Sequence, residues 1–186
     1  IQVNGASAHD PVELRLGNSD NSKYKQYTYD SKLTQDVWTN IIFAFDGTTL
    51  KAYFDGTLTT KTASSKDDTG IIQTDLVATG TGFRVASTGC GGATYFNGRV
   101  ANIGVWNVYL TDAEAAAVHT RKLGTLDSAF TDYAQQANLV HWWPICRTAT
   151  STATALADYG TGTARNLTDS AHNFSYTTDC PSEAGP

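Results

Sequence analysis

The chain has 186 residues, 40% of them hydrophobic, which is enough apolar material for one domain with a full core. Its net charge of −5 and the lack of a Lys/Arg cluster argue against a nucleic-acid partner. No apolar run approaches the roughly 20 residues of a membrane helix, which argues against membrane insertion. Because the sequence has no Met, even at position 1, we expect the chain to begin after a cleavage or to be a fragment.

Two short stretches near the start predict a β-hairpin. Residues 12–16 alternate between apolar and polar side chains, and residues 24–29 are rich in aromatic and β-branched types. A polar turn cluster at residues 17–22 separates them. Tyr27 and Tyr29 share one face of the second strand, and on an exposed face they would suit a glycan or a protein partner.

Residues 36–56 predict a second hairpin. Alternation places apolar side chains on one face of each strand, namely Ile41, Phe43 and Phe45 on the first and Leu50, Ala52 and Phe54 on the second. The two Asp-Gly pairs, at 46–47 and 55–56, supply the positive φ angles that tight turns need. We therefore interpret both aspartates as turn formers and not as metal ligands. Residues 57–82 are polar, with a short strand expected at residues 71–72.

Residues 95–122 predict a core strand followed by a helix. Apolar side chains recur near a period of two up to Trp106, which indicates a half-buried strand. Thr111 and Glu114 then form the pattern of a capping box, and the alanine-rich residues after them favour a helix over 112–121. We predict burial of the large apolar side chains of this part and of the hairpin before it: Trp38, Phe43, Phe45, Phe54, Phe96, Ile103 and Val105, with Trp106 at least partly buried.

Residues 138–145 predict a further strand, and its adjacent Trp142 and Trp143 must point to opposite faces. One ring is expected in the core, and the other either packs under the tail or serves as a sugar platform. The chain has three cysteines. We expect one disulfide, between Cys146 and Cys180, because it would pin an otherwise loose tail over residues 170–186, while three separate buried thiols remain an alternative.

Three blocks carry a family resemblance. Residues 96–114 read aromatic-x-Gly-x-apolar-Ala-x-Ile-x-Val-Trp-Asn-x-x-Leu-Thr-x-x-Glu, which resembles the last core strand of laminin G-like and pentraxin-like jelly rolls in the concanavalin A-like lectin/glucanase superfamily. Residues 38–56 are similar to the central hairpin of that family. Residues 138–168, with Leu-Val-His-Trp-Trp-Pro-Ile and a later Arg-Asn-Leu-Thr, resemble an element that often opens such a domain.

The resemblance implies an all-β fold, a single antiparallel jelly-roll sandwich over residues 1–169 with one short α-helix near residues 112–121. Residues 138–168 would then either close the same sandwich or begin a repeat, and we favour closure. Because such domains often bind calcium through loop carboxylates, the resemblance makes calcium a candidate cofactor, with Asp67 and Asp68 as ligands and Asp75 further on. The residues themselves favour a solvated acidic turn.

No pattern of a catalytic site is visible. Glycosidases need two carboxylates about 5–10 Å apart, and no pair of them stands at i, i+2 on any predicted strand. Glu114 is assigned to the helix cap, and no Gly-x-Ser-x-Gly motif is present. We therefore expect that the protein is not an enzyme.

We interpret the chain as a non-catalytic binding module, secreted or on a virion or other particle surface, that contacts a glycan or a protein within a larger assembly. The candidate ligand-binding side chains are Trp142, Trp143, Tyr27 and Tyr29. The alternative is a purely structural assembly subunit, such as a virion decoration or fibre protein or a surface-filament component, with no small ligand. The fold alone does not distinguish a binding module from a structural subunit.

Overall fold

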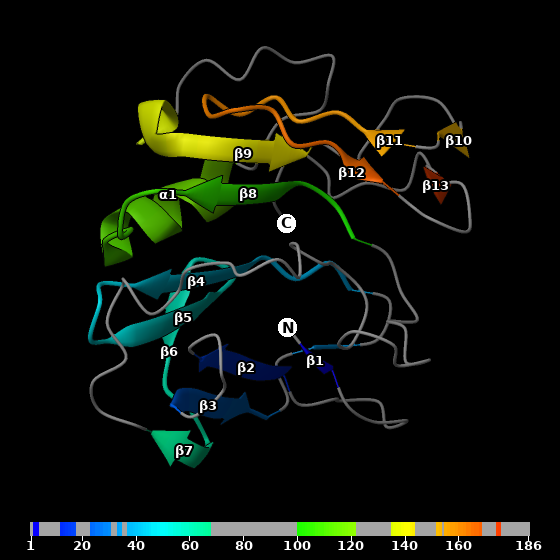
Figure 1. The fold of residues 1–186 in the computed structure, drawn as a ribbon. Helices are drawn as coiled ribbons and strands as arrows, with labels where there is room; N and C mark the ends of the chain where they lie inside the picture. Colours follow the sequence, from blue (N-terminus) through cyan, green and yellow to red (C-terminus); the bar gives the residue numbers. More distant parts are fainter. Residues whose placement is uncertain are drawn as a thin grey trace. The chain divides into compact units, whose positions relative to one another are not determined.

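The computed structural model describes residues 2–3, 12–17, 23–30, 33–34, 37–67, 100–121, 135–143, 152–153, 155–168 and 174–175. The chain divides into two compact units, Ile1–Gly98 and Arg99–Pro186. The described residues are mostly strands in antiparallel sheets, with one α-helix (Figure 1). The predicted all-β class is thereby confirmed. No helix within the described ranges is long and apolar enough to cross a membrane.

The described residues of the first unit form two antiparallel sheets (Figure 1). One has the order β1-β2-β3-β7, with β1 at Gln2–Val3, β2 at Val12–Gly17, β3 at Tyr24–Tyr29 and β7 at Ala63–Asp67. The other has the order β4-β5-β6, with β4 at Ile41–Phe45, β5 at Leu50–Phe54 and β6 at Thr57–Thr59. The two predicted hairpins correspond to the pairs β2–β3 and β4–β5.

Side chains from both sheets meet in one apolar core, so this unit is a β-sandwich. Its buried members are Val12, Leu14, Tyr27 and Tyr29 from the first sheet and Leu50, Ala52 and Phe54 from the second. The rings of Tyr29 and Phe54 lie 5.5 Å apart between centroids. Each such buried side chain contributes on the order of 1.5–3 kcal/mol through removal from water.

The predicted burial of the large apolar side chains is confirmed for Phe54 and for the partly buried Trp106. The prediction of full burial is wrong for five other side chains, which are only half-buried: Trp38, Phe43, Phe45, Ile103 and Val105. Phe43 and Phe45 do pack against the core, as the alternation predicts. The opposite face of the same strand β4 is the more buried one, through Ile42 and Ala44. Phe96 lies outside the described residues.

Both Asp-Gly pairs form turns, as predicted. Gly47 has a φ of 97°, and Asp55 and Gly56 have φ values of 49° and 74°. Asp46 Oδ1 accepts hydrogen bonds from the backbone N–H groups of Thr48 and Thr49, at 2.8 and 2.6 Å. These two bonds, with that from Thr49 the stronger, lower the pKa of Asp46. Asp55 Oδ1 accepts from the N–H of Asn40 at 2.8 Å.

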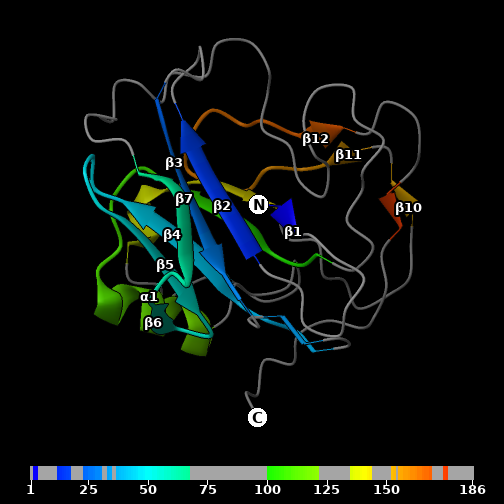
Figure 2. The same ribbon diagram turned by 90° about the horizontal axis from the view of Figure 1, so that it is seen from below.

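The second unit is built around the pair β8–β9 (Figure 1), and its strands β11 and β12 lie side by side (Figure 2). Its strands are β8 at Ile103–Trp106, β9 at Leu139–Trp143, β10 at Thr152–Ala153, β11 at Ala155–Leu156, β12 at Leu167–Thr168 and β13 at Phe174–Ser175. Its helices are α1 at Asp112–Arg121 and the short 3-10 helix η2 at Gln136–Asn138. Strands β11 and β12 pair, as do β10 and β13, all antiparallel.

The segment after the helix pairs with the strand before it: Ile103 lies opposite Trp143 and Gly104 opposite Trp142. The closure of one sandwich by residues 138–168 stays a prediction. The strand predicted from residue 95 onward begins only at Ile103 among the described residues, because Asn102 adopts a positive φ of 48° that breaks it. Part of the predicted tail is also a strand, since Phe174–Ser175 pairs with Thr152–Ala153. A single domain over residues 1–169 stays a prediction.

The helix begins with the predicted capping box. The backbone N–H of Thr111 donates to Glu114 Oε2 at 2.8 Å, and the N–H of Glu114 donates to Thr111 Oγ1 at 3.3 Å. Gln135, near η2, donates to the other oxygen, Oε1, at 2.7 Å. The bond from Gln135 and then those from Thr111 lower the pKa of Glu114. The cap therefore also ties the helix to the start of β9.

Candidate functional site

The first unit carries an open pocket of about 420 Å³. We call it the lysine pocket. It is lined by Lys25, Tyr27, Tyr29, Thr48, Thr49, Leu50, Lys51, Leu58, Thr59, Thr60 and Lys61. These residues come from β3, from the start of β5 and the turn before it, and from β6 and the segment after it. Charged and hydroxyl-bearing side chains make up most of the lining.

Strand β3 supplies one wall of the lysine pocket. Lys25, Tyr27 and Tyr29 alternate with half-buried residues along the strand, so they share the face that looks toward the other sheet. All three are buried, with exposed fractions of 6%, 6% and 2%. Burial raises the pKa of the Tyr29 hydroxyl. The wall is therefore a lysine ammonium group and two tyrosine rings held within a packed sheet.

Lys61 completes the pocket from the β6–β7 connection. Its Nζ lies 3.6 Å from the centroid of the Tyr27 ring, a cation–π contact. The next residue, Thr62, fixes this position, because its backbone N–H and its hydroxyl both donate to the carbonyl of Thr28, at 2.8 and 3.0 Å. The N–H of Asp30 in turn donates to Thr62 Oγ1 at 3.2 Å. Lys61 is thus attached through Thr62 to the same strand that carries Tyr27.

Such a lining can bind a small polar ligand without reacting with it. The threonine hydroxyls both donate and accept hydrogen bonds, and the lysine ammonium groups donate. The Asp46 carboxylate beside the pocket already accepts two backbone hydrogen bonds in its turn. The arrangement suits a ligand with many hydroxyl groups, such as a sugar.

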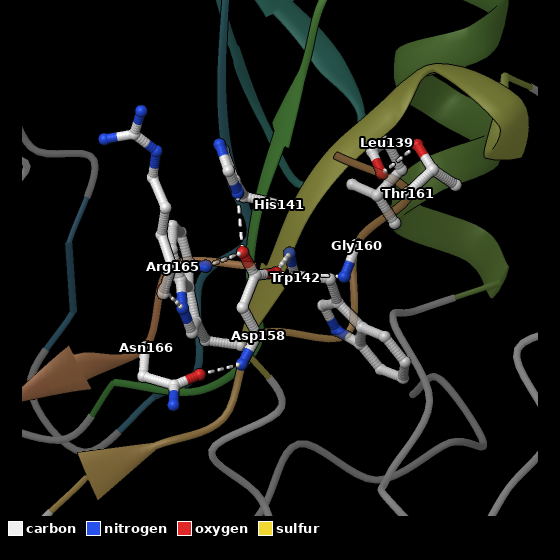
Figure 3. Close-up of polar contacts among 9 residues, drawn as sticks. Leu139, His141, Trp142, Asp158, Gly160, Thr161, Arg165 and Asn166 are labelled. Atoms are coloured by element: carbon white, nitrogen blue, oxygen red, sulfur yellow. Dashed lines mark hydrogen bonds and ion pairs between the residues drawn. The ribbon is translucent and has the colours of Figure 1, made fainter. Parts of the chain in front are cut away.

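A second polar cluster, in the second unit, centres on Asp158 (Figure 3). One carboxylate oxygen, Oδ1, accepts from the backbone N–H groups of Trp142 and Gly160, both at 2.9 Å. The other, Oδ2, accepts from the N–H of Arg165 at 2.9 Å and lies 2.6 Å from Nδ1 of His141. We call this the Asp158 clamp, because it attaches the segment after β11 to strand β9.

The clamp changes the chemistry of Asp158 itself. Burial of the carboxylate alone would raise its pKa. The hydrogen bonds from Gly160, Trp142, Arg165 and His141 outweigh this effect and lower the pKa of Asp158 to about 2. With three backbone N–H donors, the carboxylate is occupied in holding the chain, which indicates a structural role.

Close backbone contact explains the glycines in this segment. A Cβ on Gly160 would lie 2.3 Å from the carbonyl oxygen of Val140, and one on Gly162 would lie 2.8 Å from it. The N–H of Gly162 donates to that carbonyl at 2.9 Å. The segment runs directly against β9, and only glycine allows this approach at residue 160.

The two tryptophans of β9 are both buried, at 7% for Trp142 and 2% for Trp143. Trp143 stacks on the His141 imidazole, with centroids 5.5 Å apart and the planes at 13°. Its Nε1 donates to the carbonyl of Arg165 at 2.7 Å. The candidate ligand-binding rings Trp142, Trp143, Tyr27 and Tyr29 are thus packed within the protein, and the two tyrosines line the lysine pocket.

The remaining predicted site residues are only partly described. Asp67 is the last residue of β7, in register with Lys25, whereas Asp68, Cys146 and Cys180 lie outside the described residues. Within the described ranges, no group of three or more His, Cys, Asp or Glu side chains is placed to hold a metal ion. The calcium site and the disulfide stay predictions.

Sequence reasoning missed Lys25, Lys61 and the contact between His141 and Asp158. For Lys25 a signal existed, because alternation places it on the same strand face as Tyr27 and Tyr29. Lys61 is far from that strand in sequence, and no local pattern brings it over Tyr27. The Asp158 clamp closes the loop from Gly160 to Arg165, since the backbone N–H groups of both residues donate to the same carboxylate.

A family model described as the concanavalin A-like lectin/glucanases superfamily, of the laminin G type, matches residues 2–116. This match includes both sheets of the first unit, every residue of the lysine pocket and the first turn of α1. Searches of curated proteins and of solved structures find no significant match.

Proposed function

Because the chain belongs to the concanavalin A-like lectin/glucanase superfamily, we propose that it is a non-catalytic carbohydrate-binding module that works outside the cell or on a particle surface. The family supports a carbohydrate- or protein-binding role in general. The lysine pocket is the observation that favours carbohydrate, because it offers a small volume lined by hydroxyl and ammonium groups beside two tyrosines. A flat protein epitope would not require such a concave polar site.

A glycan array probed with the full chain tests this proposal. We expect at least one glycan to bind, and its affinity, measured by titration calorimetry, to fall when Thr60 is changed to Val. Thr60 is exposed and lines the pocket, whereas Thr163 is exposed and lies in the second unit. Thr163→Val is therefore the matched control and should leave the affinity unchanged.

Two results would contradict the proposal. A silent array together with a stable homo- or hetero-assembly would favour the alternative, a structural subunit without a small ligand. A glycan that binds equally well to both threonine variants would place recognition outside the lysine pocket.

Calcium is part of the same test. We propose Asp67 and Asp68 as its ligands, on the basis of the family resemblance. Asp67 is the last residue of β7, and Asp68 follows it in the sequence. The array is run with calcium and with a chelator. Loss of binding on chelation supports a calcium-dependent site, and unchanged binding argues against a role for the metal in recognition.

A further inference from the structure

We propose that Asn166 is an acceptor for an N-linked oligosaccharide. Residues 166–168 read Asn-Leu-Thr, the triplet that N-glycosylation requires in a secreted chain. The inference goes beyond carbohydrate binding, and of the proposed function it rests only on the location outside the cell. Because such triplets also arise by chance in a threonine-rich chain, the surroundings of the asparagine have to carry the argument.

The Asn166 side chain stands on the surface of the second unit. Asn166 is exposed, and so are the residues before it, 161–165. It directly precedes strand β12, so the acceptor lies in a surface connection and not inside a sheet. An N-linked oligosaccharide is bulky and hydrophilic and therefore needs a position of this kind.

A hydrogen bond fixes which end of the Asn166 amide faces outward. The backbone N–H of Asp158 donates to Oδ1 of Asn166 at 3.2 Å. Because an N–H group donates only to the oxygen of an amide, this contact also assigns the nitrogen. Figure 3 shows Nδ2 on the side that points away from Asp158. Within the part of the chain that the structure describes, Nδ2 has no hydrogen-bond partner. The atom that would carry the sugar is thus the one that the fold does not use.

The backbone on either side of Asn166 is held by contacts that do not involve its side chain. The N–H of Arg165 belongs to the Asp158 clamp, and the carbonyl of Arg165 accepts from Nε1 of Trp143 at 2.7 Å. On the other side, Leu167 pairs with strand β11. An oligosaccharide on Nδ2 leaves these contacts intact, and Oδ1 still accepts from Asp158. The folded second unit can therefore carry the modification without loss of the clamp.

The modification is a glycosyl transfer to nitrogen. Nδ2 of Asn166 forms a bond to the anomeric carbon of the oligosaccharide and gives up one proton. The bond from that carbon to the diphosphate of a lipid-linked donor breaks, and the lipid diphosphate leaves with the electron pair. No atom is oxidised or reduced. The donor and the transferase belong to the secretory pathway of the cell that makes the protein, so the chain supplies only the acceptor.

The full chain, secreted from cultured eukaryotic cells behind a cleavable signal, tests the proposal. An amidase that removes N-linked oligosaccharides is applied in heavy-oxygen water, and peptide mass mapping then finds each asparagine that was modified. We expect the mark at Asn166. Asn107 is also exposed but is followed by Val-Tyr, so it should stay unmarked and controls for spontaneous deamidation. The other triplet of the chain begins at Asn173, outside the described residues, and a mark there alone overturns the proposal.

Two substitutions of similar size separate the triplet from the fold. Thr168→Ser keeps the hydroxyl and should keep the oligosaccharide on Asn166. Thr168→Val keeps the branched shape but removes the hydroxyl, and should abolish the modification. Asn166→Gln removes the acceptor itself and serves as a second way to abolish it. An oligosaccharide that persists on Asn166 in Thr168→Val would contradict the proposal.

Thermal unfolding tests whether the fold tolerates the oligosaccharide. The modified chain should unfold at no lower a temperature than the unmodified chain from a bacterial host, because the contact between Asn166 and Asp158 survives. A clearly lower temperature would show that the oligosaccharide displaces this contact, and would overturn the assigned geometry. A secreted chain without any modification overturns the inference but leaves the proposed carbohydrate binding standing, since that is measured separately on the glycan array.

Discussion

The Nδ1 atom of His141 lies 2.6 Å from Oδ2 of Asp158, in a pair whose aspartate side chain is only 1% exposed. Although the two residues are 17 positions apart in sequence, strand β9 and the segment after β11 bring them together. The same carboxylate accepts three backbone N–H groups, so its charge stabilises a whole loop as well as one imidazole. The folded state therefore favours the ionised form of Asp158 over the protonated form.

Acid is expected to weaken the fold through Asp158. Its pKa of about 2 in the folded protein lies below the value of about 3.9 for an unfolded chain. A group with a lowered folded pKa stabilises the fold above its unfolded pKa and loses this contribution as the pH falls through its folded pKa. The contribution, on the order of 1–2 kcal/mol, should thus disappear between about pH 4 and pH 2.

Asp158→Asn measures this contribution directly. At pH 6 the variant should be less stable by about 1–2 kcal/mol in urea unfolding, and the difference from the wild type should shrink toward pH 2. Comparison of the two proteins at each pH cancels the effects of the other carboxylates. A difference that stays constant from pH 6 to pH 2 would contradict the assigned role of the charge.

Gly160→Ala should destabilise the second unit by about 1–3 kcal/mol, because the new methyl group would meet the carbonyl of Val140 and push the segment off β9. Thermal unfolding measures the loss. Thr163→Ala, an exposed change three residues further on, is the control and should have an effect within about 0.5 kcal/mol. If Gly160→Ala is as stable as the control, the close approach of the two segments is wrong.

Thr111→Ala should cost about 1 kcal/mol in stability, since it removes the hydroxyl that accepts from the Glu114 N–H. Thr120→Ala is a matched control in the last turn of the same helix. The Thr120 hydroxyl donates back to the carbonyl of Ala116 at 3.0 Å, a bond that gives helices little support. Urea unfolding of both variants should show a loss for Thr111→Ala alone, and equal losses would argue against the capping box.

Deletion of residues 137–186 should give a chain that is insoluble or molten. It removes β9, which is the pairing partner of β8 among the described residues, and it removes Leu139, Trp142, Trp143 and Leu156 from the cores of the second unit. Strand β8 would then present an open edge and uncovered apolar side chains. A truncated chain that stays soluble and unfolds in one sharp thermal transition would show that this segment is not needed.

Local signals in the sequence were sufficient for much of the fold. The Thr111–Glu114 box gave the helix start, the Asp-Gly pairs gave two turns, and alternation gave the two hairpins. Such features depend on neighbours within a few residues. The degree of burial of Phe43 and Phe45 was not predictable in this way, because it depends on which face of β4 the rest of the fold covers more fully.

The candidate site was less predictable from the sequence, because it also depends on segments that are far apart along the chain. The lysine pocket requires β3, the β4–β5 turn and the β6–β7 connection to meet, and no short pattern encodes that meeting. The aromatic pairs Tyr27/Tyr29 and Trp142/Trp143 were visible in the sequence. The sequence did not show which faces of their strands would be buried in the folded protein. The 155–168 segment covers Trp143 and satisfies its N–H. Trp142 instead packs with Leu139 and Trp106, and it meets the Tyr159 ring of that segment edge-on.

The distance along the chain between β8 and the Asp158 clamp has a consequence during synthesis. Strand β8 ends at Trp106, whereas the last residues that hold β9 in place, up to Asn166, follow roughly 60 residues later, which takes about 3–12 s at 5–20 residues per second. In the first part of that interval the nascent chain carries β8 without its partner β9, and in the rest it carries β9 without the complete Asp158 clamp. Slow translation prolongs the exposure, so poor recovery of this protein from an expression host should respond to chaperone supply more than to stabilising substitutions.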